Sequence, residues 1–589
     1  MNNKNIKLFT FFGLFWIGLG WTALVLALLG LFYIQIILFL AILAGLFLIY
    51  QVVKSKEKIS LNWEIWGVIL ISLATVFLFS RYSVPTVFSG RDQGSLANAA
   101  ISLSKNHRIQ SSFNAEKEFF KIYGPGTALN FPGFSYDQSG NLTPHFPLGY
   151  ISWLAIFYSL FGLAGLIVAN GITFFLFLIS FYFLSRIYLE KSPAFMALFL
   201  VLTSFIFSWF FKFTLGENLA LALVWFGIFQ FVFFLKKRDN LYLLAFLLTF
   251  GLLVFVRLEA LAFGFIATLL LLWQYKSWKQ IWQKLLEKKI FFTSLAMLFI
   301  FILSLKINQA FYIAFMKGFL NSFHFYKNNL VGSHHLLEGT SYVFRVLTAY
   351  ALLSYLIIGF IGFIYFLKNK KTSWLFPYLA LSPALIYVFN PSISLDHPWM
   401  LRRYVFAVIP LSILYTVLFL DAFFKKRKAY LYLFLFSLLL TNLTIFFPYL
   451  SIRQNKGLLS PIKSLSANFK KNDLVLVDRN ATGNPWAMMD GPLHSLYGKQ
   501  AVYFFNPQDL SKINLTKFNQ IYFIIPDNNL EFYKKNGLGA KLFPVKDYTL
   551  EISSLNVTAK TKNELYKTPV YLPQYQKKYI YGEIYALRK

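Results

Sequence analysis

Long apolar segments separated by short polar stretches recur along most of the chain, from about residue 8 to residue 447. Their apolarity is continuous rather than alternating, and many approach the roughly 20 residues that a helix needs to cross a bilayer. Only helices and closed barrels satisfy their backbone polar groups in hydrocarbon, and continuous apolarity favours helices. The pattern therefore predicts a mainly α, polytopic bundle of transmembrane helices.

Short basic segments between the apolar ones predict the orientation of this bundle. They are KSKEK at 54–58, KKR at 236–238, a Lys-rich run at 276–289, KNKK at 368–371 and KKRK at 425–428. Because Lys and Arg accumulate in cytoplasmic loops, we place these segments inside, together with residues 1–7. The assignment gives about thirteen net crossings of the plasma membrane, with a cytoplasmic N-terminus and an extracytoplasmic C-terminus.

The spans follow from the same pattern. They are 8–29, 31–53, 63–82, 194–211, 218–235, two short arms within 241–273, 290–315, 344–367, 374–391, 404–423 and 429–447. Residues 145–185 are long enough for two segments broken at Gly162 and Gly165. A net single crossing requires one of the two to be re-entrant or only partly inserted. Residues 83–144 are predicted to form a long outer loop, and 316–343 a polar one.

The character of the chain changes at about residue 450. Five runs rich in β-branched and aromatic residues predict strands: DLVLVD, QAVYFF, QIYFIIP, KLFPV and YGEIYAL. The stretches PWAMMDGPLHSLYG and DNNLEFYKKNG between them read as helices or turns. We therefore divide the chain into an N-terminal transmembrane hairpin (1–58), a transmembrane module (59–449) with the outer loop 83–144, and an extracytoplasmic soluble α/β domain (450–589).

Composition supports a membrane protein and excludes several other classes. Hydrophobic residues make up 57% of the chain and charged ones 14%, with a mean hydropathy of +0.56. The formal net charge of +32 is spread over the short loops rather than gathered in one patch, so membrane lipids are the expected partners and nucleic acid is not. The chain contains no cysteine, which excludes disulfides and thiolate metal sites.

Ionisable residues on the predicted outer side are the candidates for chemistry. Asp92 precedes Leu96, Ala99, Ala100 and Leu103 at helical spacing, which predicts an amphipathic helix along the outer membrane surface. Asp92 could act there as an N-cap, as a catalytic carboxylate or as both. The other outer groups are His145, Lys212, Glu217, Arg257, Glu259, Asp396, His397, Arg402 and Arg403. Any one could be an interfacial anchor, but their shared side of the membrane indicates a functional site.

The predicted loop 316–343 holds the residues that come closest to a metal site. His334 or His335 could share a helix face with Glu338, and His324 lies in the same loop. No HExxH pattern accompanies them. A divalent metal is therefore compatible with the sequence but not required by it, and we expect no certain cofactor. The chain also lacks a glycine-rich phosphate loop, so no nucleotide is implied.

Five segments, in order between about residues 60 and 420, carry a resemblance to a known family. They are GRDQGSLANAAISL, HFPLGYISWLAIFYSLFG, FTLGENLALAL, FGLLVFVRLEAL and RRYVFAVIP. The pattern resembles the C-type (GT-C) integral-membrane glycosyltransferases, especially the group containing protein O-mannosyltransferases and lipid A aminoarabinose transferases. Gln93 stands where many members have Glu, and the Lys common before the HFPLGY-like element is absent. The WWDYG signature of oligosaccharyltransferases is also missing, which argues against transfer of a whole glycan.

The resemblance implies inverting transfer of a sugar from a polyprenyl-phosphate donor to a protein, lipid or glycan acceptor at the outer face. It assigns Asp92 as the base and Glu217 as its catalytic partner, although Glu217 could equally position a sugar hydroxyl or pair with Lys212. Arg402, Arg403, Arg257, Lys212 and His145 are expected to bind the donor phosphate. Arg91, Gln93, Tyr404 and Asp396 are expected to contact substrate.

Two other functions remain open at this point. A lipid or sugar-lipid transporter would need basic groups along a path through the membrane, and a catalytically silent envelope scaffold would use its outer domain for binding. The sequence specifies neither the sugar, the polyprenol, the acceptor class nor the oligomeric state.

Overall fold

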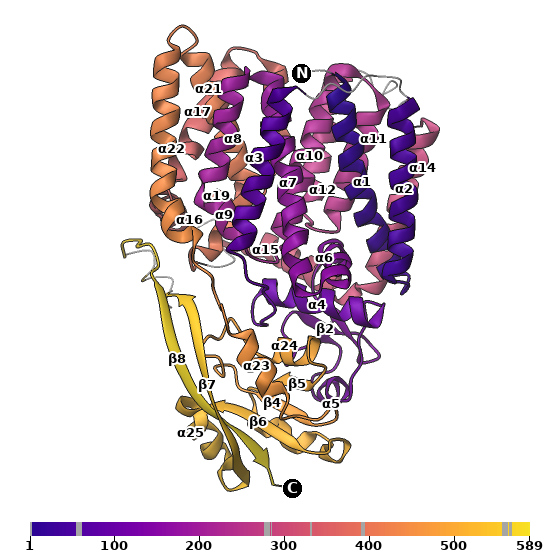
Figure 1. Cartoon of the computed structure of the whole chain (residues 1–589), viewed down its shortest axis with the longest axis vertical. Coiled ribbons are helices and arrows are strands. Elements are labelled where there is room, and N and C mark those ends of the chain that lie inside the picture. The colour runs from indigo at the N-terminus through magenta and orange to yellow at the C-terminus, as the bar shows by residue number, and fades with distance from the viewer. Residues whose placement is uncertain are drawn as a thin grey trace.

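The computed structural model describes residues 3–54, 62–275, 286–329, 333–389, 395–556 and 568–588, together with residues 283 and 564. A helical bundle forms one half of the molecule and a smaller domain with a β-sheet forms the other (Figure 1). The two chain termini lie at opposite ends of the molecule. The predicted class, a mainly α bundle with a C-terminal α/β domain, is confirmed.

The bundle is built from apolar helices of varied length. They are α1 (Asn3–Leu28), α2 (Ile34–Lys54), α3 (Trp63–Arg81), α6 (Leu148–Phe161), α7 (Leu163–Tyr188), α8 (Lys191–Thr203), α9 (Phe205–Phe211), α10 (Gly216–Lys237), α11 (Asn240–Val254), α12 (Ala260–Tyr275), α14 (Lys288–Ile307), α15 (Gln309–Asn329), α16 (Ser333–Ala349), α17 (Leu353–Lys368), α18 (Thr372–Leu381), α19 (Ile386–Phe389), α20 (Arg402–Val405), α21 (Val408–Phe423) and α22 (Lys428–Leu450).

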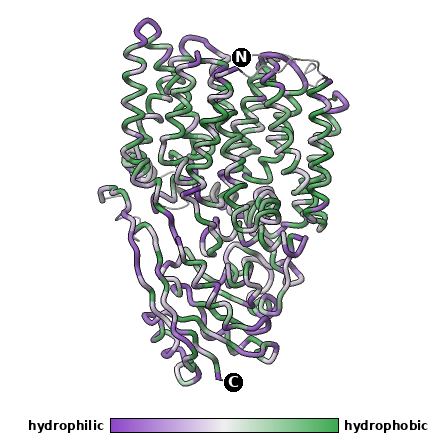
Figure 2. Tube along the Cα trace, in the orientation of Figure 1, coloured by the Kyte–Doolittle hydropathy of each residue, from purple (hydrophilic) through white to green (hydrophobic). Residues whose placement is uncertain are grey.

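Within the described ranges, eight helices are long and apolar enough to cross a membrane, and the number rises to eleven if each of three bent pairs is one span. The protein is thus a multi-pass membrane protein. The predicted thirteen crossings would be reached only if two of the shorter apolar helices α6, α11 and α12 also cross. Figure 2 shows the apolar residues concentrated in the bundle and a mixed pattern in the C-terminal domain.

The two ends of the bundle differ in charge and in what covers them. The basic turn between α21 and α22 lies at the end farthest from the C-terminal domain, as does the N-terminus (Figure 1). The other end abuts the C-terminal domain. Two of the basic segments on which the predicted orientation depends, 55–58 and most of 276–285, lie outside the described residues.

Residues 145–185 form two helices, as predicted, and only the second is long enough to span. Helix α6 has 14 residues and α7 has 26, with Gly162 between them at a φ of 57°. Gly165 allows the tight turn because a Cβ there would lie 1.9 Å from the carbonyl oxygen of Phe157. The prediction of a polar loop at 316–343 is wrong, since α15 and α16 extend through most of it. Polar residues mark the limit of an apolar layer but not the end of a helix.

The outer segment between α3 and α6 folds into two helices and a small sheet. Helix α4 (Asp92–Asn106) is followed by α5 (Asn114–Tyr123) and by the antiparallel strands β1 (Gly126–Thr127), β2 (Phe134–Tyr136) and β3 (Leu142–Pro144). Helix α4 packs against α6 on one side and α24 on another, and is buried from Gln93 to Ile101. The predicted helix is therefore present, but it is buried, because the C-terminal domain covers its polar side.

The C-terminal domain is organised around a five-stranded sheet in the order β5-β4-β6-β8-β7. The strands are β4 (Leu474–Val477), β5 (Gln500–Tyr503), β6 (Ile521–Pro526), β7 (Leu542–Leu555) and β8 (Tyr575–Leu587), and the helices are α23 (Leu459–Ser466), α24 (Asp490–Ser495) and α25 (Leu530–Tyr533). Strand β4 pairs in parallel with β5 and β6, and β8 runs antiparallel to β6 and β7. All five predicted strands are present.

One hydrophobic core joins the outer loop to this sheet. Phe119 and Tyr136 from the loop belong to the same buried cluster as Leu476 and Phe523 from the strands. Loop and domain therefore form a single unit outside the bundle, although they are far apart in the sequence. The domain boundaries given above remain predictions.

Candidate active site

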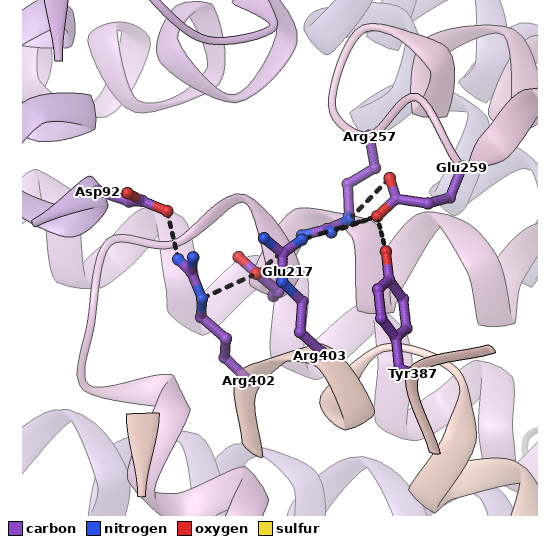
Figure 3. A network of polar contacts seen from close by, with 7 residues as sticks. All are labelled: Asp92, Glu217, Arg257, Glu259, Tyr387, Arg402 and Arg403. Carbon is purple, nitrogen blue, oxygen red and sulfur yellow. Dashed lines mark hydrogen bonds and ion pairs between the residues drawn. The ribbon is translucent and has the colours of Figure 1, made fainter. Parts of the chain in front are cut away.

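Charged side chains from four segments of the chain, with Tyr387 from a fifth, converge on one site (Figure 3). The site adjoins the C-terminal domain, because Arg91, next to Asp92, contacts Trp486. We call these residues the charged cluster: Asp92 at the start of α4, Glu217 in the first turn of α10, Arg257 and Glu259 in the turn between α11 and α12, Tyr387 in α19, and Arg402 and Arg403 in α20. Three carboxylates thus face three guanidiniums, so the charges of the cluster are balanced.

Arg402 links the two carboxylates assigned to catalysis. Its Nη1 forms a short ion pair with Oδ2 of Asp92, and its Nε lies 3.9 Å from Oε1 of Glu217. Only 6% of the Arg402 side chain is exposed, whereas 40% of the Asp92 side chain is. The Asp92 carboxylate is therefore held from the buried side and open to an incoming molecule.

A second set of contacts extends the cluster to Tyr387. Arg257 places Nη1 2.8 Å from Oε1 of Glu217 and Nη2 2.5 Å from Oε1 of Glu259. The hydroxyl of Tyr387 donates a short hydrogen bond to Oε1 of Glu259. Arg403 is bound more loosely, because its Nη1 is 3.7 Å from Oε1 of Glu259 and its buried Nε has no hydrogen-bond partner among the described residues.

Close backbone packing places the turn that carries Arg257. The N–H of Gly149 donates a 2.7 Å hydrogen bond to the carbonyl of Phe255, and a Cβ at Gly149 would lie at the same distance from that oxygen. Only glycine fits at this position, so the start of α6 docks directly on the end of α11. The HFPLGY segment therefore contributes to the site through its backbone.

Buried amides place the segment that precedes Glu217. The Asn218 side chain donates to the carbonyls of Phe210 and Phe213, and the Asn170 side chain donates to those of Phe211 and Phe213. These bonds fix the carbonyls of the turn that follows α9, two of which also accept backbone N–H groups. Glu217 then occupies the first turn of α10, where the helix dipole favours a negative charge.

The arginines decide the ionisation of the cluster carboxylates that lie outside the spans. Burial raises the pKa of Asp92, but the positive charges of Arg402, Arg403 and Arg257 outweigh burial and hold that pKa below its usual range. Burial likewise raises the pKa of Glu259, but Arg257 lowers it to about 2. Both carboxylates are charged at neutral pH.

A second ion pair stands beside the cluster. Arg91 pairs with Asp396, and its guanidinium lies 4.6 Å from the ring centroid of Trp399. The guanidinium of Arg402 lies at the same distance from that ring. Two of the residues expected to contact substrate, Arg91 and Asp396, are therefore adjacent to Asp92 and Arg402.

Four predicted site residues have other contacts. The Nζ of Lys212 donates to the carbonyls of Tyr449, Leu450 and Ile452 at 2.7 to 2.9 Å, so Lys212 caps α22 and does not pair with Glu217. Nδ1 of His145 bonds to the Ser135 hydroxyl at 2.7 Å. Gln93 is buried, and the Tyr404 hydroxyl donates to the carbonyl of Tyr387 at 2.7 Å. In the described part of the chain, neither Lys212 nor His145 bonds to a residue of the charged cluster.

The alternative role of Asp92 as a helix cap does not hold. The N-cap position of α4 is Arg91, which makes no side-chain cap bond, and Asp92 is the first helical residue. Its carboxylate turns to Arg402 instead of to the backbone N–H groups of its own helix. The first turn of a helix still favours its negative charge.

Tyr387 and Trp399 are members of this site that sequence reasoning missed. Trp399 stands three residues before Arg402, a spacing that brings side chains together on a helical turn and could have identified it. Tyr387 lies in an apolar run without any such signal. Among the described residues, no group of three or more His, Asp or Glu side chains could hold a metal ion. The side chains of His324, His334 and His335 lie outside the described residues.

The segment just before Asp92 is clamped to the C-terminal domain. Ser89 and Met488 exchange backbone hydrogen bonds of 3.1 and 3.0 Å, and the Ser89 hydroxyl forms a short bond to the buried carboxyl group of Asp490. Burial raises the pKa of Asp490 to about 6, although the Ser89 hydroxyl acts in the opposite direction. The carboxyl group thus titrates near neutral pH at this contact.

This pKa predicts a pH dependence of stability. Between the usual value of 3.8 and about 6 the folded protein binds more protons than the unfolded chain, so Asp490 makes stability fall as pH rises through that range. We expect Asp490→Asn to raise the melting temperature in detergent at pH 7.5, by the equivalent of at most about 3 kcal/mol, and to give no gain at pH 4. The exposed Asp547, changed to Asn, is the control. An equal shift at both pH values would contradict the assignment.

Comparisons with known proteins find similar structures but no similar sequence. No protein-family model matches the chain, and neither does any curated protein. The structure of ArnT from Cupriavidus metallidurans in the apo state is 12% identical with a TM-score of 0.49, covering 82% of this chain and 96% of that one. The same protein bound to undecaprenyl phosphate gives a TM-score of 0.47.

A third similar structure is the archaeal oligosaccharyltransferase AglB from Archaeoglobus fulgidus, in complex with an inhibitory peptide and a dolichol-phosphate. It is 12% identical with a TM-score of 0.46, covering 80% of this chain and 70% of that one. The search thus returned membrane transferases of the class that the sequence motifs resemble. All these TM-scores lie below 0.5, so the functional proposal rests on the geometry of the charged cluster.

Proposed function

We propose that the protein is an inverting glycosyltransferase that moves a sugar from a polyprenyl-phosphate donor to an acceptor hydroxyl at the outer face of the membrane. The observation that carries the proposal is an exposed carboxylate, Asp92, held by the buried guanidinium of Arg402 with Arg403 next to it. A base and a phosphate-binding pair of arginines are the groups that this reaction requires.

The donor phosphate would bind between Arg402 and Arg403. Arg403 suits this role because, within the described part of the chain, its one ion pair is long, at 3.7 Å, and its buried Nε lacks a hydrogen-bond partner. A phosphodiester oxygen would satisfy that donor. Planar guanidiniums bind phosphate oxygens through paired donors, so two adjacent arginines suit a phosphodiester better than lysines would.

Asp92 would accept the proton of the acceptor hydroxyl. The acceptor oxygen then attacks the anomeric carbon from the side opposite the phosphate, the bond from that carbon to the phosphate oxygen breaks, and polyprenyl phosphate leaves with the bonding electrons. No acid is needed, because the leaving group is a stable anion. The arginines offset its developing charge.

The ion pair between Asp92 and Arg402 couples donor binding to this step. In the free protein Arg402 lowers the pKa of Asp92, which makes the carboxylate a weak base. A bound phosphate would draw the Arg402 donors toward itself and return basicity to Asp92. The base would thus become active only when the donor is in place.

The position of the cluster favours the enzyme over the transporter. The cluster adjoins the C-terminal domain, because Arg91 beside Asp92 contacts Trp486, whereas a transporter would need charged groups along its path through the membrane. The apolar helices that surround the cluster suit the polyprenyl tail. The basic turn between α21 and α22 lies at the end of the bundle farthest from the C-terminal domain, so the positive-inside rule supports an extracytoplasmic position of the cluster.

Transfer of radiolabelled sugar tests the proposal. Membranes containing the protein, and matched membranes without it, are incubated with a panel of polyprenyl-phosphate sugars and total envelope acceptors. We expect label in acceptor, one polyprenyl phosphate released per sugar transferred, and inverted configuration at the anomeric carbon. Retained configuration would exclude the mechanism. Absence of transfer from every donor, together with donor flux across vesicles, would favour the transporter.

A further inference from the structure

Aromatic rings and guanidiniums alternate from the C-terminal domain into the charged cluster. The guanidinium of Arg479 lies 5.3 Å from the ring centroid of Trp486, and that of Arg91 lies 4.9 Å from the same ring. Arg91 and Arg402 each lie 4.6 Å from the ring centroid of Trp399. We call these five residues the stacked ladder: Arg479, Trp486, Arg91, Trp399 and Arg402.

The stacked ladder leads from the surface to the buried centre of the site. Trp486 is 47% exposed, the Arg91 side chain is 17% exposed and that of Arg402 is 6% exposed. The negative face of each aromatic ring attracts the guanidinium that contacts it, and this attraction grows as water is excluded. The inner end of the ladder is the residue that holds Asp92.

The backbone around Trp486 is held in place independently of the ring. The Trp486 N–H donates to Oδ1 of Asn484 at 3.0 Å, and the Thr482 hydroxyl donates to the carbonyl of Ala487 at 2.8 Å. A Cβ at Gly90, whose φ is +97°, would lie 2.9 Å from the carbonyl oxygen of Pro485. The segment that carries Trp486 therefore crosses directly over the residue that precedes Arg91.

We propose that Trp486 is a positioning residue of the catalytic centre, which acts through Arg91 and Trp399 to fix the guanidinium of Arg402 where it can contact both Asp92 and the donor phosphate. The C-terminal domain would then be needed for the chemistry on the donor and not only for the choice of acceptor. This inference rests on the proposed function. It assigns a role to the sole tryptophan of residues 450–589.

Loss of the ring should act on the chemical step. In Trp486→Ala, Arg91 and Trp399 lose their outer support. Arg402 gains freedom to leave its position between Asp92 and the donor phosphate, so it offsets the charge of the leaving phosphate less well. We expect the turnover rate to fall about tenfold with little change in KM for the acceptor. Because Arg402 lowers the pKa of Asp92, the acid limb of the pH–rate profile should move to higher pH. Trp486→Phe, which keeps a ring face, should restore most of the rate.

Hydrolysis of the donor without acceptor separates positioning from acceptor recognition. A positioning role predicts that Trp486→Ala slows hydrolysis as much as transfer. Phe532→Ala, which removes a 41% exposed ring from the same domain, should leave both rates unchanged. An effect confined to the acceptor KM, or an unmoved acid limb, would overturn the proposal and make Trp486 an acceptor contact.

A measurement that does not require enzyme activity tests the stacked ladder independently of the proposed function. The full chain is labelled with 5-fluorotryptophan. The ¹⁹F resonances of Trp486 and Trp399 are identified by their loss in Trp486→Phe and Trp399→Phe. The stacked ladder predicts that Arg91→Gln shifts both resonances, whereas Arg588→Gln shifts neither. If the wild type transfers no sugar but both resonances shift, the ladder stands and the proposed function falls. If neither resonance shifts, the ladder falls whatever the activity.

Discussion

Asp92→Asn is expected to lower sugar transfer by about 10²- to 10⁴-fold, the range that a positioned general base contributes. The amide keeps the size of the side chain but cannot take a proton from the acceptor hydroxyl. The variant also removes the anion that occupies Arg402, so its affinity for undecaprenyl phosphate should equal or exceed that of the wild type. Initial rates of radiolabel transfer and direct binding of undecaprenyl phosphate in detergent measure the two effects.

Asp239→Asn is a matched control for this change. Asp239 caps α11 by accepting a 3.0 Å hydrogen bond from the N–H of Leu241, and asparagine caps helices equally well. Full activity is expected. If Asp92→Asn transfers sugar at the wild-type rate while its protein remains folded, Asp92 is not the base and the search moves to Glu217 or Asp396.

Arg402→Lys is expected to lower kcat/KM for the donor by about 10²-fold, the size of effect seen when one donor to a developing negative charge is removed. A lysine keeps the charge but has neither the planar donor fork nor the flat face that stacks on Trp399. It therefore cannot contact Asp92, Glu217 and a phosphate at the same time. Initial rates over a range of donor concentrations measure the loss.

Arg588→Lys is the control for Arg402→Lys. Arg588 also stacks on an aromatic ring, 5.2 Å from the centroid of Phe543, but it follows β8 in the C-terminal sheet and contacts the edge strand β7. We expect Arg588→Lys to transfer sugar at the wild-type rate. A loss of less than about threefold in Arg402→Lys would show that the charge alone suffices, and Arg403 would then become the principal ligand of the phosphate.

The order and character of the elements could be predicted because they depend on local pattern. Long apolar runs predict spans such as α1 and α10 without knowledge of their neighbours, and β-branched runs predict strands such as β4 and β6. The side of the membrane is also predicted from local sequence, because each basic turn indicates the orientation of the two helices that it joins. For that reason Asp92, Arg257 and Arg402 could be expected on one side of the membrane, and the structure brings them together.

The side chain or carbonyl that each charged residue contacts could not be predicted, because it belongs to a segment distant in the sequence. Glu217 follows Lys212 by five residues, yet it pairs with Arg257 and Arg402, while Lys212 binds carbonyls at the end of α22. The non-helical residues 213–215 between α9 and α10 separate the two side chains, which then meet different helices. Only the packing of α11, α20 and α22 decides which partner each one meets.

The sequence by itself determined a multi-pass bundle, a C-terminal α/β domain and a set of ionisable residues on one side, because hydropathy and charge act residue by residue. Tertiary structure decided which of those residues form a site. The contact between Ser89 and Asp490 joins residues 401 positions apart and lies just before Asp92. Helix α4 is buried because a domain encoded at the other end of the chain covers it, and no local pattern carries that information. The ion pairs of Asp92 and the contacts of Trp486 follow from that docking.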